Sequence, residues 1–270
     1  MKKIFAFVVA AMLCITGVAL VGCGNEDEPV VKIDEIHIVA PASSEIKAGE
    51  KFTLDYTTMP ETAADKIKVD WQISDSHRLS YSNGEFTALT CGTVKVTANV
   101  KGNEATDEIE LKVVAPDGFT EYAGTGYKLV RPSNWTAGTL GTVRTWTAAN
   151  GTTNMNITTE TLNAAYFSAP ASSFQTAIES TYGLLGYTVD FAQSVTVKKN
   201  KYLGIERVQV NYAYSLTKGG STSTYHQTQM IINNAQANKS CVLTVTFLEE
   251  DFDEDAAKLQ ETIFSQFMPD

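Results

Sequence analysis

Val94-Lys95-Val96-Thr97-Ala98-Asn99-Val100 alternates apolar and polar side chains without interruption. This period of two predicts a strand with one buried face, because successive side chains of a strand point to opposite faces. The same alternation recurs on both sides of this run, and no stretch between residues 31 and 114 has the 3.6-residue period of a helix. The apolar positions of the other runs are Ile36 and Ile38; Phe52, Leu54 and Tyr56; Val69, Trp71 and Ile73; and Ile109, Leu111 and Val113. We therefore expect residues 31–115 to form a small all-β sandwich.

Turn residues separate these runs, as short strands of a sandwich require. Pro41, Gly49, Met59-Pro60 and Lys101-Gly102-Asn103 each end an apolar run. Asn83-Gly84 predicts a tight hairpin, because both residues tolerate a positive φ.

The order of these segments resembles the bacterial immunoglobulin-like domain, group 2. The likeness is carried by Val69-Asp70-Trp71-Gln72-Ile73-Ser74, by Ser82-Asn83-Gly84-Glu85-Phe86-Thr87-Ala88, and by Cys91-Gly92-Thr93-Val94-Lys95-Val96-Thr97. It implies an immunoglobulin-like sandwich with Trp71 packed between the sheets. Cys91 stands where the family usually has a small residue, which favours a buried thiol. The family implies a spacer or a binding module, without catalysis.

Ala115-Pro116-Asp117-Gly118 marks the expected domain boundary, since proline and glycine end the last strand. Residues 116–270 then mix strands with two helical patterns, which predicts an α+β domain: an antiparallel sheet packed with two helices. Strands are expected at residues 127–130, 143–147, 155–159, 195–197, 208–214, 225–232 and 241–247, with turns at Asn150-Gly151 and Lys218-Gly219-Gly220.

The first helical pattern covers residues 173–185, and the closing helix covers about residues 253–267. Ser172 and Gln175 have the spacing of a capping box, and Gly186 suits the left-handed residue after a helix. The expected inward residues are Phe174, Ala177, Ile178, Tyr182 and Leu185 in the first helix and Ala256, Leu259, Ile263 and Phe267 in the second.

This second domain resembles the PsbP-like family of small α+β domains. Gly126-Tyr127-Lys128-Leu129-Val130-Arg131-Pro132-Ser133-Asn134-Trp135 carries the likeness best, and residues 195–214 and Ile263-Phe264-Ser265-Gln266-Phe267 add to it. The resemblance implies binding to a protein partner and no catalytic set. Its motifs are packing motifs, so no functional residue can be carried over.

The first 22 residues have the layout of a signal peptide. Lys2 and Lys3 give a positive start, and an apolar run follows as far as Leu20-Val21-Gly22-Cys23. This ending resembles the bacterial lipobox, in which a small residue precedes an invariant cysteine. The resemblance implies cleavage after Gly22 and acylation of Cys23, which makes the lipid bilayer a partner. On length alone, a membrane-spanning anchor is the alternative.

Residues 23–30 are expected to form a flexible acidic tether. Glu26-Asp27-Glu28 resembles the acidic signal that sends Bacteroidota lipoproteins to the outer face of the outer membrane. A plain charged spacer and a Gram-positive membrane anchor are the alternatives. We expect an exported, lipid-anchored protein of the cell envelope, at the outer-membrane surface.

The charge balance excludes two classes of partner. The chain has 31 acidic and 21 basic residues and a net charge of −10. Nucleic acid needs a basic patch to neutralise its phosphates, and anionic lipid attracts basic segments. We therefore expect neither nucleic-acid binding nor electrostatic docking on a membrane.

The sequence lacks the common motifs of catalytic and metal sites. His37, His77 and His226 have no second histidine four residues on, no cysteine pair has zinc spacing, and no serine lies in a Gly-x-Ser-x-Gly elbow. We expect no catalytic residue, no metal and no cofactor. Cys91 and Cys241 are expected to be unpaired apolar residues in different cores.

Two further patterns leave alternatives open. Asp251, Asp253 and Asp255 alternate as calcium ligands can, but a calcium loop needs glycine where Ala256 stands and glutamate where Thr262 stands, which favours helix capping. Exposed aromatic residues could form a binding platform, and the candidates are Trp135, Trp146, Tyr166 and Phe167.

The sequence thus favours a non-catalytic lipoprotein whose second domain binds a protein or a glycan. A periplasm-facing accessory factor of an envelope complex is the first alternative. A hydrolase built around His226 is the second.

Overall fold

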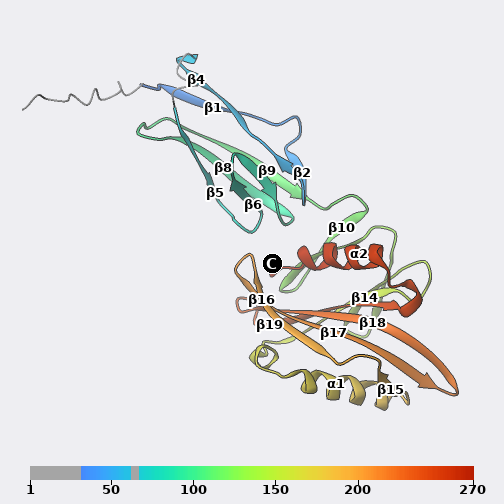
Figure 1. Cartoon of the computed structure of the whole chain (residues 1–270). Helices are drawn as coiled ribbons and strands as arrows, with labels where there is room; N and C mark the ends of the chain where they lie inside the picture. The colour runs from blue at the N-terminus through green and yellow to red at the C-terminus, as the bar shows by residue number, and fades with distance from the viewer. Residues whose placement is uncertain (1–31, 62–66) are drawn as a thin grey trace, which may run out of the picture.

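The computed structural model describes residues 32–61 and 67–270, shown in colour in Figure 1. The expected signal peptide, Gly22, Cys23 and the tether lie outside these residues. No helix of the described chain has the length and apolar content to span a bilayer.

The first part of the chain, as far as residue 114, is all β. Its sheets are two-stranded (β1-β4), four-stranded (β2-β9-β8-β5) and three-stranded (β3-β7-β6). The strands are β1 (Glu35–Val39), β2 (Glu45–Lys47), β3 (Lys51–Phe52), β4 (Asp55–Met59), β5 (Val69–Ile73), β6 (Leu79–Ser82), β7 (Glu85–Ala88), β8 (Gly92–Val100) and β9 (Thr106–Val114).

Alternation along the strands builds the core of this part. Val94 and Val96 of β8 face inward with Leu111 of β9, and all three pack against Phe86 of the three-stranded sheet. Trp71 is half-buried, and its ring contacts Phe86 and Tyr56, which belong to the other two sheets. Asn83 and Gly84 have φ values of 54° and 85°, so the predicted hairpin between β6 and β7 is confirmed.

One expected strand is wrong, because the structure divides it into two strands in different sheets. Phe52, Leu54 and Tyr56 were expected on one strand, but Phe52 ends β3 and Tyr56 lies in β4. β3 pairs with β7 whereas β4 pairs with β1, so the chain changes sheet at Leu54. Leu54 is buried in the core at this change of sheet, which an alternation pattern alone does not reveal.

The second part contains a β-hairpin, an eight-stranded antiparallel sheet and two helices. The sheet has the order β12-β13-β14-β19-β18-β17-β15, and β16 also pairs with β17. The elements are β10 (Phe119–Gly124), β11 (Tyr127–Pro132), β12 (Thr136–Leu140), β13 (Val143–Thr147), β14 (Asn154–Thr161), η2 (Ala164–Phe167), α1 (Ala171–Leu184), β15 (Thr188–Phe191), β16 (Thr196–Tyr202), β17 (Ile205–Lys218), β18 (Ser221–Asn234), β19 (Lys239–Leu248), η3 (Glu249–Asp251) and α2 (Glu254–Ser265).

The large sheet has one helix on each face (Figure 1). We call these the α1 face and the α2 face. On the α2 face, Leu243 and Val245 pack under Ile263 of α2, and the β10-β11 hairpin covers the rest of this core. On the α1 face, Val208 and Tyr214 pack under α1. The expected shared faces of residues 208–214 and 241–247 are confirmed.

The first helix differs from the expectation at both ends. α1 begins at Ala171, its N-cap is Pro170, and no side chain caps it, so the predicted capping box of Ser172 and Gln175 is wrong. Because the helix already begins at Ala171, Ser172 lies inside its first turn and cannot occupy the N-cap position that a capping box requires. Gly186 has the expected positive φ of 78°.

The expected inward face of α1 is also too wide. Phe174 and Ile178 are buried, but Ala177 is exposed and Leu185 is 57% exposed. The helix touches the sheet through a narrow stripe, and Leu185 lies beyond its last turn.

The closing helix α2 is held at both ends. The Asp253 carboxylate accepts a hydrogen bond of 2.9 Å from the Ala256 backbone N–H, as the capping interpretation predicts. At the other end the buried Arg207 guanidinium donates to the carbonyls of Phe264 and Phe267 at 2.9 and 2.6 Å. Burial lowers the pKa of Arg207 to about 10. Its cation lies 4.3 Å from the centre of the Tyr202 ring, which contributes a cation–π contact.

Candidate functional site

The two described cysteines are free and differ in their surroundings. Cys241 is buried in the core of the second part, as expected, and burial raises its pKa to about 11. Cys91 was expected in the core of the first part, but it lies at the junction of the two parts. Cys91 lies in the bend between β7 and β8, where its thiol contacts Gln266 of the second part instead of the core.

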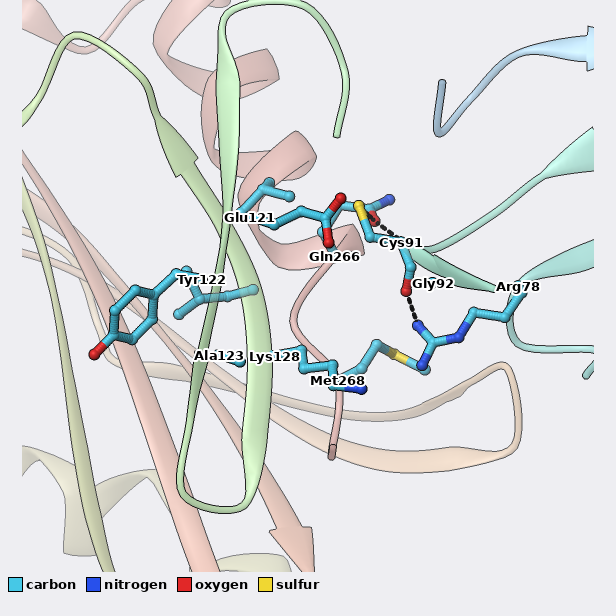
Figure 2. Close-up of a pocket in the computed structure, with 11 residues that line it drawn as sticks. Arg78, Cys91, Gly92, Glu121, Tyr122, Ala123, Lys128, Gln266 and Met268 are labelled. Atoms are coloured by element: carbon cyan, nitrogen blue, oxygen red, sulfur yellow. Dashed lines mark hydrogen bonds between the residues drawn. The ribbon is translucent and has the colours of Figure 1, made fainter. Parts of the chain in front are cut away.

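A pocket of about 310 Å³ lies at this junction. Arg78 and Cys91 line it from the first part, and Glu121, Lys128 and Gln266 line it from the second (Figure 2). The view shows Gln266 directed at Cys91, whereas the ring of Tyr122 points away.

Gln266, just after α2, makes every side-chain hydrogen bond found between residues 32–114 and residues 119–270 of the described chain. Its amide nitrogen donates to the Leu89 carbonyl at 2.7 Å, and its amide oxygen accepts from the Cys91 backbone N–H at 3.1 Å. The Cys91 thiol also donates weakly to this oxygen, at 3.4 Å. Burial, with a smaller contribution from Glu121, raises the Cys91 pKa to about 12. A neutral thiol with a bonded amide is suited to joining two domains and is unsuited to nucleophilic chemistry.

Gly92 is required beside this contact. Its φ is 139°, and a Cβ at this position would lie 2.7 Å from Nε of Arg78. The Arg78 guanidinium donates to the Cys91 carbonyl and forms an ion pair of 3.4 Å with Asp75. The polar groups of Arg78, Cys91 and Gln266 are therefore already bonded within the protein.

His226 forms a pair with a carboxylate, as the hydrolase hypothesis requires. Its Nε2 lies against Glu249, and its ring stacks on Phe252 with the centres 4.3 Å apart. Within the described ranges, however, no hydroxyl or thiol hydrogen-bonds to the ring, so the structure does not assemble the nucleophile that the hypothesis also needs.

The three alternating aspartates have separate partners. Asp251 accepts from Asn150 at 2.8 Å, Asp253 caps α2, and Asp255 lies 3.8 Å from Lys258. The residues that the structure describes include no group of three potential ligands gathered for a metal ion.

The alternative of an exposed aromatic platform does not hold for the four residues named for it, which lie in or against the cores. Trp146 and Trp135 are 1% and 7% exposed and belong to the core under α2. Tyr166 and Phe167 are half-buried against the core under α1.

A different surface gathers uncharged polar side chains on the α1 face of the large sheet. β14, β19 and β18 place six amides and hydroxyls there in two cross-strand rows, Asn154–Thr246–Gln227 and Asn156–Thr244–Gln229. We call these six residues the polar tray. They line a depression of about 540 Å³ next to α1.

Three tyrosines border the polar tray on the side nearest α1. The hydroxyls of Tyr182 and Tyr214 lie 2.8 Å apart, and the Tyr214 hydroxyl donates to Oε1 of Gln227 at 2.8 Å. Gln227 in turn donates to the Tyr212 hydroxyl. Burial raises the pKa of Tyr182, Tyr212 and Tyr214, so these phenols stay protonated and hold Gln227 in one orientation.

Reasoning from the sequence missed the tray. Apolar residues mark the α2 face of β14 and β19, and the alternation alone does not distinguish a binding surface from an ordinary solvent-facing side at the polar positions between them. The alternation Asn154-Met155-Asn156-Ile157 was the available signal.

No family model matches the chain, and no curated protein matches it in sequence. Solved structures that match the chain include three that each cover a little over half of it, as an α+β fold. One is cyanobacterial PsbP (CyanoP) from Synechocystis sp. PCC 6803, with 12% identity, a TM-score of 0.45, and coverage of 57% of this chain and 94% of that chain.

Two further structures match at lower scores. The Ran-binding protein Mog1p of Saccharomyces cerevisiae has 11% identity and a TM-score of 0.36, over 56% of this chain and 94% of that chain. A protein from Bacteroides thetaiotaomicron VPI-5482 has 13% identity and a TM-score of 0.35, over 56% of this chain and only 48% of that one. At these identities and scores the likenesses carry no argument about function.

Proposed function

We propose that the chain is an exported bacterial lipoprotein, anchored through an acylated Cys23 at the outer-membrane surface. Its immunoglobulin-like first domain is a spacer, and its PsbP-like second domain is a non-catalytic module that binds a glycan or a protein. The anchoring is inferred from the lipobox-like Leu20-Val21-Gly22-Cys23.

The polar tray is the observation that carries the binding part of the proposal. It lies on the α1 face, whereas the first part of the chain joins the second beside α2 and Gln266 (Figure 1). A ligand can therefore reach the tray from the side of the protein opposite the spacer. The pair of His226 and Glu249 without a bonded nucleophile gives less support to a hydrolase.

Two experiments test the anchoring and the surface location. Cells expressing the chain are fed labelled palmitate, and the expected label on the protein is lost in Cys23→Ser. Protease treatment of intact cells then separates surface exposure from the periplasmic alternative, since a periplasmic protein would survive. An unlabelled, cytosolic wild-type protein would refute the anchoring.

The binding role is tested with residues 24–270, incubated with glycan arrays and with solubilised envelope fractions. Loss of the captured component in tray variants supports the proposal. Failure to retain any glycan or protein would refute it.

A further inference from the structure

We propose that the polar tray is a binding site for a neutral oligosaccharide, an inference that rests on the proposed binding function and names its ligand class. The depression it lines, at about 540 Å³, is within the range of small-ligand sites.

The tray is uncharged in a strongly acidic protein. The fourteen residues that line the depression are Thr, Asn, Gln, Tyr, Gly, Leu and Val, and none carries a charge. The two rows continue beyond β14 onto Thr147 and Thr145, which are also neutral. A ligand with phosphate, carboxylate or ammonium groups would lose hydration here without gaining an ion pair. The surface therefore favours a neutral polar ligand.

The tray also holds polar groups that the protein leaves unpaired. Within the described ranges, the side chains of Asn156, Gln229, Thr244 and Thr246 make no hydrogen bond, although the two threonines are only 5% and 8% exposed. Among the residues that the structure describes, the single buried side-chain nitrogen or oxygen without a partner is Nε of Arg207. The free tray atoms are therefore open to the depression, where a ligand can bond to them.

The chemistry and the spacing of these groups suit sugar hydroxyls. Amides and hydroxyls both donate and accept hydrogen bonds, as a sugar hydroxyl does. Neighbouring strands lie about 4.8 Å apart, and successive residues on one face of a strand lie about 6.8 Å apart. The tray is thus a rigid grid of donors and acceptors, which a chain of hydroxylated rings can follow.

Tyr225 supplies an aromatic surface at the edge of this grid. It is partly buried, and its ring stacks on Tyr214 with the centres 5.6 Å apart. Support from Tyr214 fixes the ring, and a fixed aromatic face can pack against the C–H face of a sugar.

The test uses residues 24–270 on an array of neutral oligosaccharides built from glucose, galactose, mannose and xylose, beside sulfated and uronic-acid oligosaccharides. Binding is then measured by NMR titration of the best neutral sugar. We expect saturable shifts at β14, β18 and β19, and an affinity that is unchanged between low and moderate salt because no ion pair forms.

Gln229→Leu is expected to lower the affinity about tenfold, through loss of hydrogen bonds in a mostly buried site. Gln209→Leu is the matched control, because Gln209 pairs with Met230 and lies on the α2 face. It is expected to leave the affinity unchanged. Thermal unfolding of both variants shows that each is folded.

Three outcomes would overturn the inference: binding of acidic oligosaccharides alone, no binding to any neutral oligosaccharide, or equal affinity for wild type and Gln229→Leu. Capture of an envelope protein through the tray would also overturn it, yet would leave the proposed binding function standing.

Discussion

Replacing Gln266 with alanine is expected to release the second domain from the first. The amide of Gln266 bonds to the Leu89 carbonyl at 2.7 Å and to the Cys91 backbone N–H at 3.1 Å. With the weak bond from the Cys91 thiol to the same amide oxygen, these are the side-chain hydrogen bonds that join residues 32–114 to residues 119–270 of the described chain. The variant removes both strong bonds and the weak one while leaving the core of each part intact.

The size of the effect follows from the number of bonds. A neutral hydrogen bond contributes about 0.5–1.5 kcal/mol net, so the loss of two costs roughly 1–3 kcal/mol of docking free energy. The undocked fraction should therefore rise by about 5- to 150-fold.

Alkylation of Cys91 reports the undocked state. In the docked protein this thiol reacts slowly at pH 8, because burial raises its pKa to about 12. The rate of iodoacetamide labelling, followed by mass spectrometry of residues 24–270, should rise in Gln266→Ala. Small-angle X-ray scattering should show a larger radius of gyration. Cys241, buried in the other core, is the internal control.

Gln260→Ala is the matched control variant, since Gln260 lies in α2, close in sequence to Gln266, but does not line the pocket at the junction. It should label at the wild-type rate. If Gln266→Ala also labelled and scattered like the wild type, the two hydrogen bonds would not determine domain docking.

Three further outcomes are expected. Arg207→Met removes the donors at the end of α2 and should lower the free energy of unfolding by roughly 2 kcal/mol in urea titrations; a more stable variant would show that the cost of burying the charge dominates. The buried phenol of Tyr214 has a raised pKa, so its contribution to stability is fully present below pH 10 and is lost as the pH rises further; an equal urea midpoint at pH 8 and pH 11 would contradict this. Gly92→Ala, with a Cβ 2.7 Å from Arg78, should destabilise the protein by about 1–3 kcal/mol, more than Gly102→Ala, where the added Cβ meets nothing within 4 Å.

The sequence predicts the strands well where one face is buried. Val94, Val96, Ala98 and Val100 alternate strictly and are all buried. Hairpins were also predictable, because Asn83-Gly84 has a local backbone requirement that does not depend on the rest of the fold.

Features set by tertiary contacts were not predictable. The chain changes sheet between Phe52 and Tyr56 because each end finds a different partner strand. The start of α1 depends on Pro170 instead of the expected capping box. Gln266 meets Cys91 across 175 residues of sequence, and no local pattern encodes that contact.

The polar tray was predictable from the sequence only in part. Each tray residue is visible in the sequence as a polar position in a strand, but the grouping depends on the register of β14, β19 and β18. The lipid anchor at Cys23 stays a prediction from the sequence.

The two faces of the large sheet differ, since one forms the core under α2 and the other carries the polar tray. This separation affects how the sequence can vary. Along β14 and β19, every second residue packs in the core under α2, and the residues between them take no part in that core. Substitutions in the tray can therefore change what the protein recognises while leaving the packing under α2 in place. Such a scaffold lets the chemistry of the tray vary independently of the core.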